Sequence, residues 1–170
     1  MTSKRLSLQS FLFLLLISIS VTAQNKNEKS INRTLDQWHK DVADSNFDDY
    51  FNAFTKGGIF IGTDAGEIWN VEEFKSFSKP YFDKKKTWNF KPLDRNIYFS
   101  DDGKIAWFDE ILDTWMGICR GSGVMIKDNK NNWKIAHYVL SVTVPNDDMK
   151  KIIEVKKTND SLILNKLRNK

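Results

Sequence analysis

The chain has 170 residues and a formal net charge of +4, which suits one domain able to bury about two-thirds of its extended surface. No basic stripe alternates with stacking aromatic residues, which argues against nucleic acid as a partner. Cys119 is the single cysteine, so an intramolecular disulfide is excluded. Because Cys119 lies in an apolar run, we expect it to be a small core residue rather than a nucleophile.

Residues 1–23 have the pattern of a signal peptide, with Lys4 and Arg5 before the apolar core Phe11–Ile19 and small residues up to Ala23. The apolar core is too short to span a membrane. We therefore expect an exported protein, periplasmic or secreted, without stable membrane association after cleavage. An uncleaved anchor is the alternative. Loss of Lys4 and Arg5 would lower the formal charge from +4 to +2.

Two helices are predicted after a polar linker at residues 24–29. The first, Ser30–Asp44, has apolar residues at helical spacing, namely Ile31, Leu35, Trp38 and Val42. His39 lies beside this apolar face, either as a boundary residue or as a polar group at a pocket rim. The second is a short helix that starts near Asn46 or Asp48 and ends at Thr55.

A short strand, Ile59–Asp64, and its return at Glu67–Trp69 come before a third helix, Val71–Lys84. Asn70 and Glu73 have the spacing of a capping box at the start of this helix. Pro80 is expected to kink the helix or to end it near Lys79.

Four long strands follow, at residues 88–100, 104–114, 117–127 and 133–144, each rich in β-branched and aromatic residues. Helices collected before such a sheet predict an α+β fold in which they pack on the concave face and leave a conical cavity. The domain is expected to cover residues 30–148. Residues 149–170 form a charged tail with a peripheral helix at Met149–Leu167.

Charged residues inside two of these strands predict a buried ion pair. If the turn after the second long strand centres on Trp115, Glu110 lies opposite Arg120 and shares a face with Phe108 and Tyr138. Such a pair could bind an acidic ligand or only brace the sheet. The opposite face would expose an apolar set, and two such faces are expected to pack as a homodimer; the set is Trp107, Trp133, Ile135 and His137.

Several short motifs, in this order, resemble the SnoaL-like group of the nuclear transport factor 2-like superfamily. They are Trp38-His39, Phe60-Ile61-Gly62-Thr63-Asp64, Trp69, Phe74-Lys75, Pro80-Tyr81-Phe82, Ala106-Trp107-Phe108-Asp109-Glu110, Arg120-Gly121, Trp133-Lys134-Ile135-Ala136 and Pro145-Asn146. The resemblance covers roughly Ile31 to Met149 and implies the conical α+β fold and a homodimer. It implies no single activity, because the superfamily mixes isomerases, dehydratases, polyketide cyclases and non-catalytic binders.

The resemblance suggests Asp64 as a catalytic residue. Ketosteroid isomerase and SnoaL-type cyclase members often place an acid–base carboxylate at the end of this first strand. At the mouth of an apolar cavity, Asp64 could remove a proton next to a carbonyl, with Tyr138 or Glu110 near the developing oxyanion. The run Thr63-Asp64-Ala65-Gly66 also suits a simple turn, which is the alternative.

Two functions are therefore open. The first is binding, without catalysis, of a small and partly apolar molecule that can carry an acidic group. The expected pocket residues are Trp38, Trp69, Phe108, Glu110, Arg120 and Tyr138. The second is an acid–base enzyme of the isomerase, dehydratase or cyclase kind with Asp64 as general base. His39 and His137 lack metal-ligand spacing, so neither a metal nor another cofactor is expected.

Overall fold

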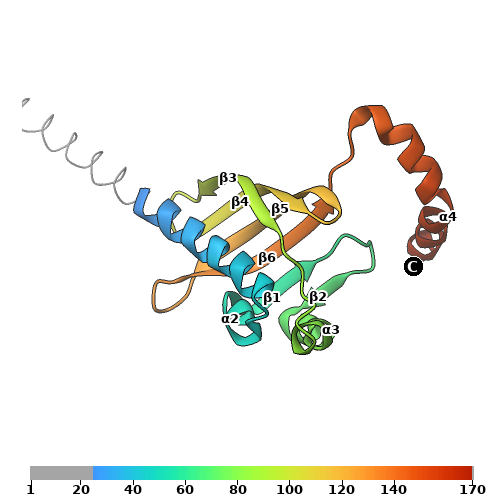
Figure 1. Cartoon of the computed structure of the whole chain (residues 1–170). Coiled ribbons are helices and arrows are strands. Elements are labelled where there is room, and N and C mark those ends of the chain that lie inside the picture. Colours follow the sequence, from blue (N-terminus) through green and yellow to red (C-terminus); the bar gives the residue numbers. More distant parts are fainter. Residues whose placement is uncertain (1–24, 170) are drawn as a thin grey trace, which may run out of the picture.

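The computed structural model describes residues 25–169, and three of its helices pack against one six-stranded sheet (Figure 1). The strands lie in the order β2 (Ile68–Asn70), β1 (Phe54–Ile61), β6 (Trp133–Val142), β5 (Gly117–Lys127), β4 (Ile105–Thr114) and β3 (Lys91–Phe99). Neighbouring strands are antiparallel except β1 and β6, which are parallel. The sheet curls without closing, and the predicted α+β fold with an extra C-terminal helix is confirmed.

The described part of the N-terminal helix covers residues 25–43. It is followed by α2 (Phe47–Asn52), β1 (Phe54–Ile61), β2 (Ile68–Asn70), α3 (Val71–Asp83), β3 (Lys91–Phe99), β4 (Ile105–Thr114), β5 (Gly117–Lys127), β6 (Trp133–Val142), the 3-10 turn η1 (Asn146–Asp148) and α4 (Met149–Arg168). Residues 25–29, predicted as a linker, are helical because they contain no glycine or proline to end the helix. The predicted signal peptide, residues 1–23, lies outside the described residues.

The N-terminal helix crosses the sheet and supplies much of the core (Figure 1). The four apolar residues predicted to share one face are all buried: Ile31, Leu35, Trp38 and Val42. This confirms the spacing argument. No helix among residues 25–169 is long and apolar enough to cross a membrane.

α3 begins as predicted but does not end where Pro80 suggests. The Asn70 side chain accepts hydrogen bonds from the backbone of Glu72 and Glu73, and the Glu73 side chain accepts one from the Asn70 amide. The helix continues through Pro80 to Asp83, so the expected end near Lys79 is wrong. The missing proline N–H removes only one helical bond, and burial of Phe82 beyond it holds the last turn on the core.

The register of β4 on β5 differs from the predicted one. The connecting turn holds two residues, Trp115 and Met116, so Thr114 pairs with Gly117. Glu110 therefore lies opposite Gly121, and the predicted Glu110–Arg120 pair is wrong. A turn centred on one residue and a turn of two residues differ by one position. That difference sends every β5 side chain to the opposite face.

The inner face of β5 consequently carries small or flexible residues, namely Cys119, Gly121, Gly123 and Met125. The register of β6 on β5 shifts between the pairs Val124–His137 and Met125–Ile135. Because of this bulge, Trp133 and Ile135 are buried on the same side as Tyr138. The expected apolar outer face is thus smaller than predicted, although Trp107 does lie on it and is half-exposed.

Candidate functional site

A buried carboxylate lies at the centre of the interior. Glu110 on β4 is fully buried, and its Oε1 accepts hydrogen bonds from His39 Nε2 at 2.8 Å and from the Tyr138 hydroxyl at 2.9 Å. Its Oε2 accepts from Arg95 Nε at 2.9 Å and lies 2.8 Å from Arg95 Nη2. We call these four residues the Glu110 cluster. It joins the N-terminal helix, β3, β4 and β6, so one carboxylate fixes helix and sheet together.

Arg95 extends this cluster to the surface of the N-terminal helix. It is the cross-strand partner of Glu110 on β3, and its side chain is only 6% exposed. Its Nη1 donates to Asn32 Oδ1 at 2.9 Å and to Asp36 Oδ1 at 2.8 Å. The guanidinium thus has one buried and one exposed carboxylate partner, which matches its planar array of donors.

The cluster keeps Glu110 ionised. Burial by itself would raise the pKa of Glu110, but the hydrogen bond and charge from His39 and those of Arg95 outweigh it and hold the pKa below its usual range. Burial and the neighbouring Glu110 charge raise the pKa of Tyr138 well above its usual range. Tyr138 therefore stays protonated as a donor, and His39 must carry its proton on Nε2 to donate to an ionised carboxylate.

Stability should depend on pH through Glu110. The pKa of Glu110 in the folded chain lies below its ordinary value of 4.5, which applies to the unfolded chain. The stabilising effect of the ionised carboxylate is therefore present above pH 4.5 and is lost as the pH falls through the folded pKa. We expect the free energy of unfolding of the natural protein to fall toward that of Glu110→Gln as pH drops from 6 to 3. Denaturant titrations of both proteins measure this. If the two proteins differ by the same free energy of unfolding at every pH from 6 to 3, the Glu110 charge does not account for the pH dependence.

Aromatic rings surround the cluster on the side of α2 and α3. Trp38 lies 4.7 Å from the Tyr138 ring and stacks on Tyr50 at 5.2 Å with an interplanar angle of 12°. Phe108 lies 6.1 Å from Tyr138. The Trp38 Nε1 and the Tyr50 hydroxyl are both buried, and neither has a hydrogen-bond partner within residues 25–169. Unpartnered buried donors are uncommon in proteins and mark places where a further acceptor would be favourable.

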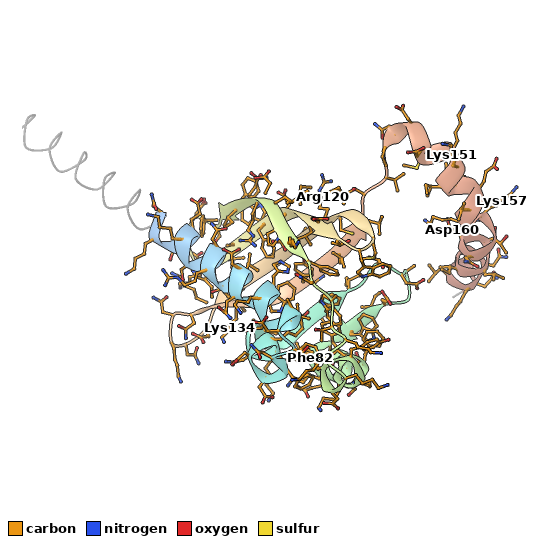
Figure 2. The ribbon with its side chains drawn as sticks, viewed as in Figure 1. Phe82, Arg120, Lys134, Lys151, Lys157 and Asp160 are labelled. Carbon is orange, nitrogen blue, oxygen red and sulfur yellow. The ribbon has the colours of Figure 1, made fainter. Side chains whose placement is uncertain are left out.

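An open hollow of about 510 Å³ reaches Trp38 from the surface. It lies between the N-terminal helix, α2 and β6, and its lining residues are Arg33, Thr34, Gln37, Trp38, Asp41, Asp49, Asn52, Ala53 and Lys134. We call it the Trp38 hollow. Lys134, which Figure 2 shows beside the N-terminal helix, donates to the Asn52 carbonyl at 2.6 Å. Asp41 is buried and accepts from Gln37 at 2.8 Å. The hollow therefore combines an indole with side chains of both charges.

Two further hollows lie on the outer side of the N-terminal helix and between α2 and α3. Glu110 lines none of the three. No group of three or more potential ligands among residues 25–169 is arranged to hold a metal ion.

The sequence profile of the SnoaL-like domain family matches residues 31–145. The chain belongs to this family. Three solved structures show the same nuclear transport factor 2-like fold at low sequence identity, and no curated protein sequence matches the chain. Because all three identities are below 25%, these structures show the fold of this SnoaL-like domain and not its activity.

The first is a nuclear transport factor 2-like protein of unknown function from Pseudomonas putida KT2440, with a TM-score of 0.60, 10% identity, and coverage of 72% of this chain and 90% of that one. The second is a candidate ketosteroid isomerase from Shewanella frigidimarina NCIMB 400, with a TM-score of 0.54, 17% identity, and coverage of 66% and 94%. The third is a candidate scytalone dehydratase from Novosphingobium aromaticivorans DSM 12444, with a TM-score of 0.60, 9% identity, and coverage of 73% and 89%.

Four of the six predicted pocket residues of this SnoaL-like domain come together: Trp38, Phe108, Glu110 and Tyr138. Trp69 lies apart on β2, half-buried, and stacks on Phe77 at 4.5 Å. Arg120 is exposed on the outer face, opposite Ile111, and Figure 2 shows it well away from Phe82 of α3. Arg120 is therefore not a pocket residue, because the two-residue turn reverses the faces of β5.

Asp64 lies in the exposed turn between β1 and β2. Its Oδ1 accepts a hydrogen bond from the Gly66 amide at 2.8 Å, and the Glu67 side chain accepts one from the Asp64 amide. This is the turn geometry that the local residue pattern predicts. The structure does not bring Asp64 to the Glu110 cluster.

Sequence reasoning missed Arg95 as the partner of Glu110. A usable signal was present in the sequence, because Arg95 alternates in step with the apolar residues Ile97 and Phe99 along β3. In the structure all three are less exposed than the residues between them. The same period of two would have placed Arg95 on the inner face. Neither alternative for His39, a boundary residue or a polar group at a pocket rim, matches its position, because His39 is buried in the core and bonds to Glu110.

Proposed function

We propose that this domain binds a small, partly apolar molecule in the Trp38 hollow and does not convert it. The observation that carries this is the unpartnered buried donor Trp38 Nε1, because the Trp38 side chain lines a hollow that is open to solvent. A ligand with a flat apolar body and an acceptor oxygen would cover the indole and supply a missing hydrogen bond. Arg33 and Lys134 in the lining would favour an acidic group on its polar end.

The state of the carboxylates supports binding without catalysis. Both oxygens of Glu110 are occupied by donors from His39, Arg95 and Tyr138, so Glu110 has no free position from which to take a substrate proton. Asp64 is held in an exposed turn. We also propose that the protein is exported, on the residue pattern of its first 23 residues, and that it forms a homodimer.

The second candidate is an acid–base enzyme that uses Asp64. What favours it is the fold shared with structures named for a ketosteroid isomerase and a scytalone dehydratase. In such an enzyme Asp64→Asn would abolish turnover, whereas a binding domain would keep its ligand affinity in this variant.

The binding proposal predicts a specific effect of Trp38→Phe, tested with 2-naphthoate, which has a flat apolar body and a carboxylate. This substitution keeps an aromatic ring and removes the indole N–H. We expect it to weaken 2-naphthoate binding about tenfold, because one hydrogen bond to a charged acceptor is worth roughly 1.5 kcal/mol or more. Isothermal titration calorimetry gives the affinities, and the indole N–H signal of Trp38 in nitrogen-15 NMR spectra should move on titration.

The matched control is Trp107→Phe, the same change on the outer face of the sheet, where the side chain is 47% exposed. Its affinity should equal that of the natural protein. If Trp38→Phe and Trp107→Phe bind 2-naphthoate with equal affinity, or if the Trp38 signal does not move on titration, the Trp38 hollow is not the binding site.

A further inference from the structure

α4 is an amphipathic helix without a partner in the described chain. None of its 20 residues is buried, and its main packing neighbour is η1, the turn directly before it. Figure 1 shows α4 standing clear of the sheet and of α2 and α3. Large apolar side chains are exposed along it: Met149, Ile153, Val155, Leu162, Leu164 and Leu167. Exposed apolar residues in this number indicate a surface that another element covers.

One stripe of α4 has the spacing of a helix-pairing seam. Positions separated alternately by four and three residues fall on one face: Met149, Ile153, Lys156, Asp160, Ile163 and Leu167. This 3.5-residue period is the one that keeps a seam turned toward a partner helix. The two central members form an ion pair within the helix, with Lys156 Nζ 3.4 Å from Asp160 Oδ2. We call these six residues the α4 seam.

The pattern of apolar and charged residues in the α4 seam is symmetric about the middle of the helix. Apolar residues occupy its two ends, and a lysine and an aspartate occupy its centre. If two copies pair antiparallel, Met149 faces Leu167 and Ile153 faces Ile163. Lys156 of each copy then faces Asp160 of the other. A parallel pair would instead place lysine on lysine and aspartate on aspartate, which like-charge repulsion disfavours.

We propose that α4 pairs antiparallel with α4 of a second copy of this chain, through the α4 seam. Such a pair is self-complementary in shape and charge, as a twofold interface requires. It covers apolar residues of both helices and gives each central charge an opposite charge across the interface. The inference gives the proposed homodimer an interface at α4, and it does not depend on ligand binding in the Trp38 hollow.

A membrane surface fits the same helix less well. Insertion of the apolar stripe would carry Lys156 and Asp160 into the acyl region, where a second copy's charges are absent. One basic residue, Lys156, also lies within the stripe itself and not on the opposite face. Figure 2 shows Lys151, Lys157 and Asp160 along this helix.

Charge reversal tests the pairing in the full chain, by sedimentation equilibrium at 0.15 M salt. Asp160→Lys should raise the dissociation constant of the dimer at least tenfold, since it places four lysines at the centre of the α4 seam. Lys156→Asp should do the same with four aspartates. The double variant Lys156→Asp/Asp160→Lys restores both ion pairs and should return to within about threefold of the natural value. Circular dichroism checks that the helix is retained.

Glu154→Lys is the control, because it makes the same charge change as Asp160→Lys on the opposite side of the helix. It should change the dissociation constant by less than about threefold. Equal effects of Glu154→Lys and Asp160→Lys, or no rescue by the double variant, would overturn the proposal.

Disulfide trapping tests the orientation. Ile153→Cys and Ile163→Cys should form a mixed disulfide when the two variants are combined, and neither should cross-link to itself. The native Cys119 is fully buried and adds little background. A self-disulfide of Ile153→Cys would show parallel pairing and overturn the proposal. So would monomeric protein that binds vesicles of phosphatidylcholine and phosphatidylglycerol, which would assign α4 to a membrane surface.

Discussion

Arg95→Ala is expected to lower the free energy of unfolding by about 3–5 kcal/mol, which would make it one of the most damaging single changes in the domain. The variant leaves Glu110 as a fully buried carboxylate without its cation, and Asn32 and Asp36 also lose a partner. Urea denaturation at pH 7 measures the change.

The matched control is Arg120→Ala, the same substitution on the same sheet. Arg120 is exposed and forms no ion pair within residues 25–169, so its loss should change stability by less than about 0.5 kcal/mol. The double variant Arg95→Met/Glu110→Gln removes both charges and keeps an acceptor for His39 and Tyr138. It should recover more than half of the loss caused by Arg95→Ala. If the double variant loses as much stability as Arg95→Met and Glu110→Gln lose in sum, the two side chains do not interact.

Gly121→Ala should destabilise the protein by about 1–3 kcal/mol through overpacking at the cluster. Gly121 lies opposite Glu110 on β5, and a methyl group there would overlap the Tyr138 hydroxyl. It would also lie 2.8 Å from Tyr138 Cζ and 3.0 Å from Glu110 Cγ. Both neighbours are buried, so neither can move away freely, and the hydrogen bond from Tyr138 to Glu110 would be distorted.

Two comparisons make this result specific. Gly57→Ala makes the same change in β1 where no atom lies within 4 Å, and it should have little effect on thermal unfolding. Gly121→Ala introduced into Tyr138→Phe should cost less than in the natural protein, because the overlapping hydroxyl is gone. If Gly121→Ala destabilises the natural protein and Tyr138→Phe equally, overlap with the Tyr138 hydroxyl is not the reason for the loss.

The Glu110 cluster also bears on how the domain could work. Its contacts come from the N-terminal helix, β3, β4 and β6, so the position of Trp38 over the sheet depends on a charge network next to it. His39 follows Trp38 in the same helix. A change that removes the Glu110 charge should therefore disturb the Trp38 hollow as well as stability, which is why Trp38→Phe is the cleaner test of binding.

The sequence by itself determined the elements whose signals are local. The burial of Ile31 and Trp38 follows from helical spacing, and α3 begins where Asn70 and Glu73 form a capping box. β5 begins and ends at the predicted residues. β1 was less well predicted, because a helix was expected up to Thr55 and a strand only from Ile59, beyond Gly57 and Gly58. In fact the strand starts at Phe54 and its pairing with β6 is irregular across these glycines.

The candidate site divides in the same way. The sequence marked Glu110 as a charge inside an apolar strand and placed it on one face with Phe108 and Tyr138, since alternation within a strand is a local property. Only the tertiary structure decided that its cation is Arg95 and not Arg120. That choice depends on which strands are neighbours and on a turn of two residues, and a shift of one residue reverses a whole strand face.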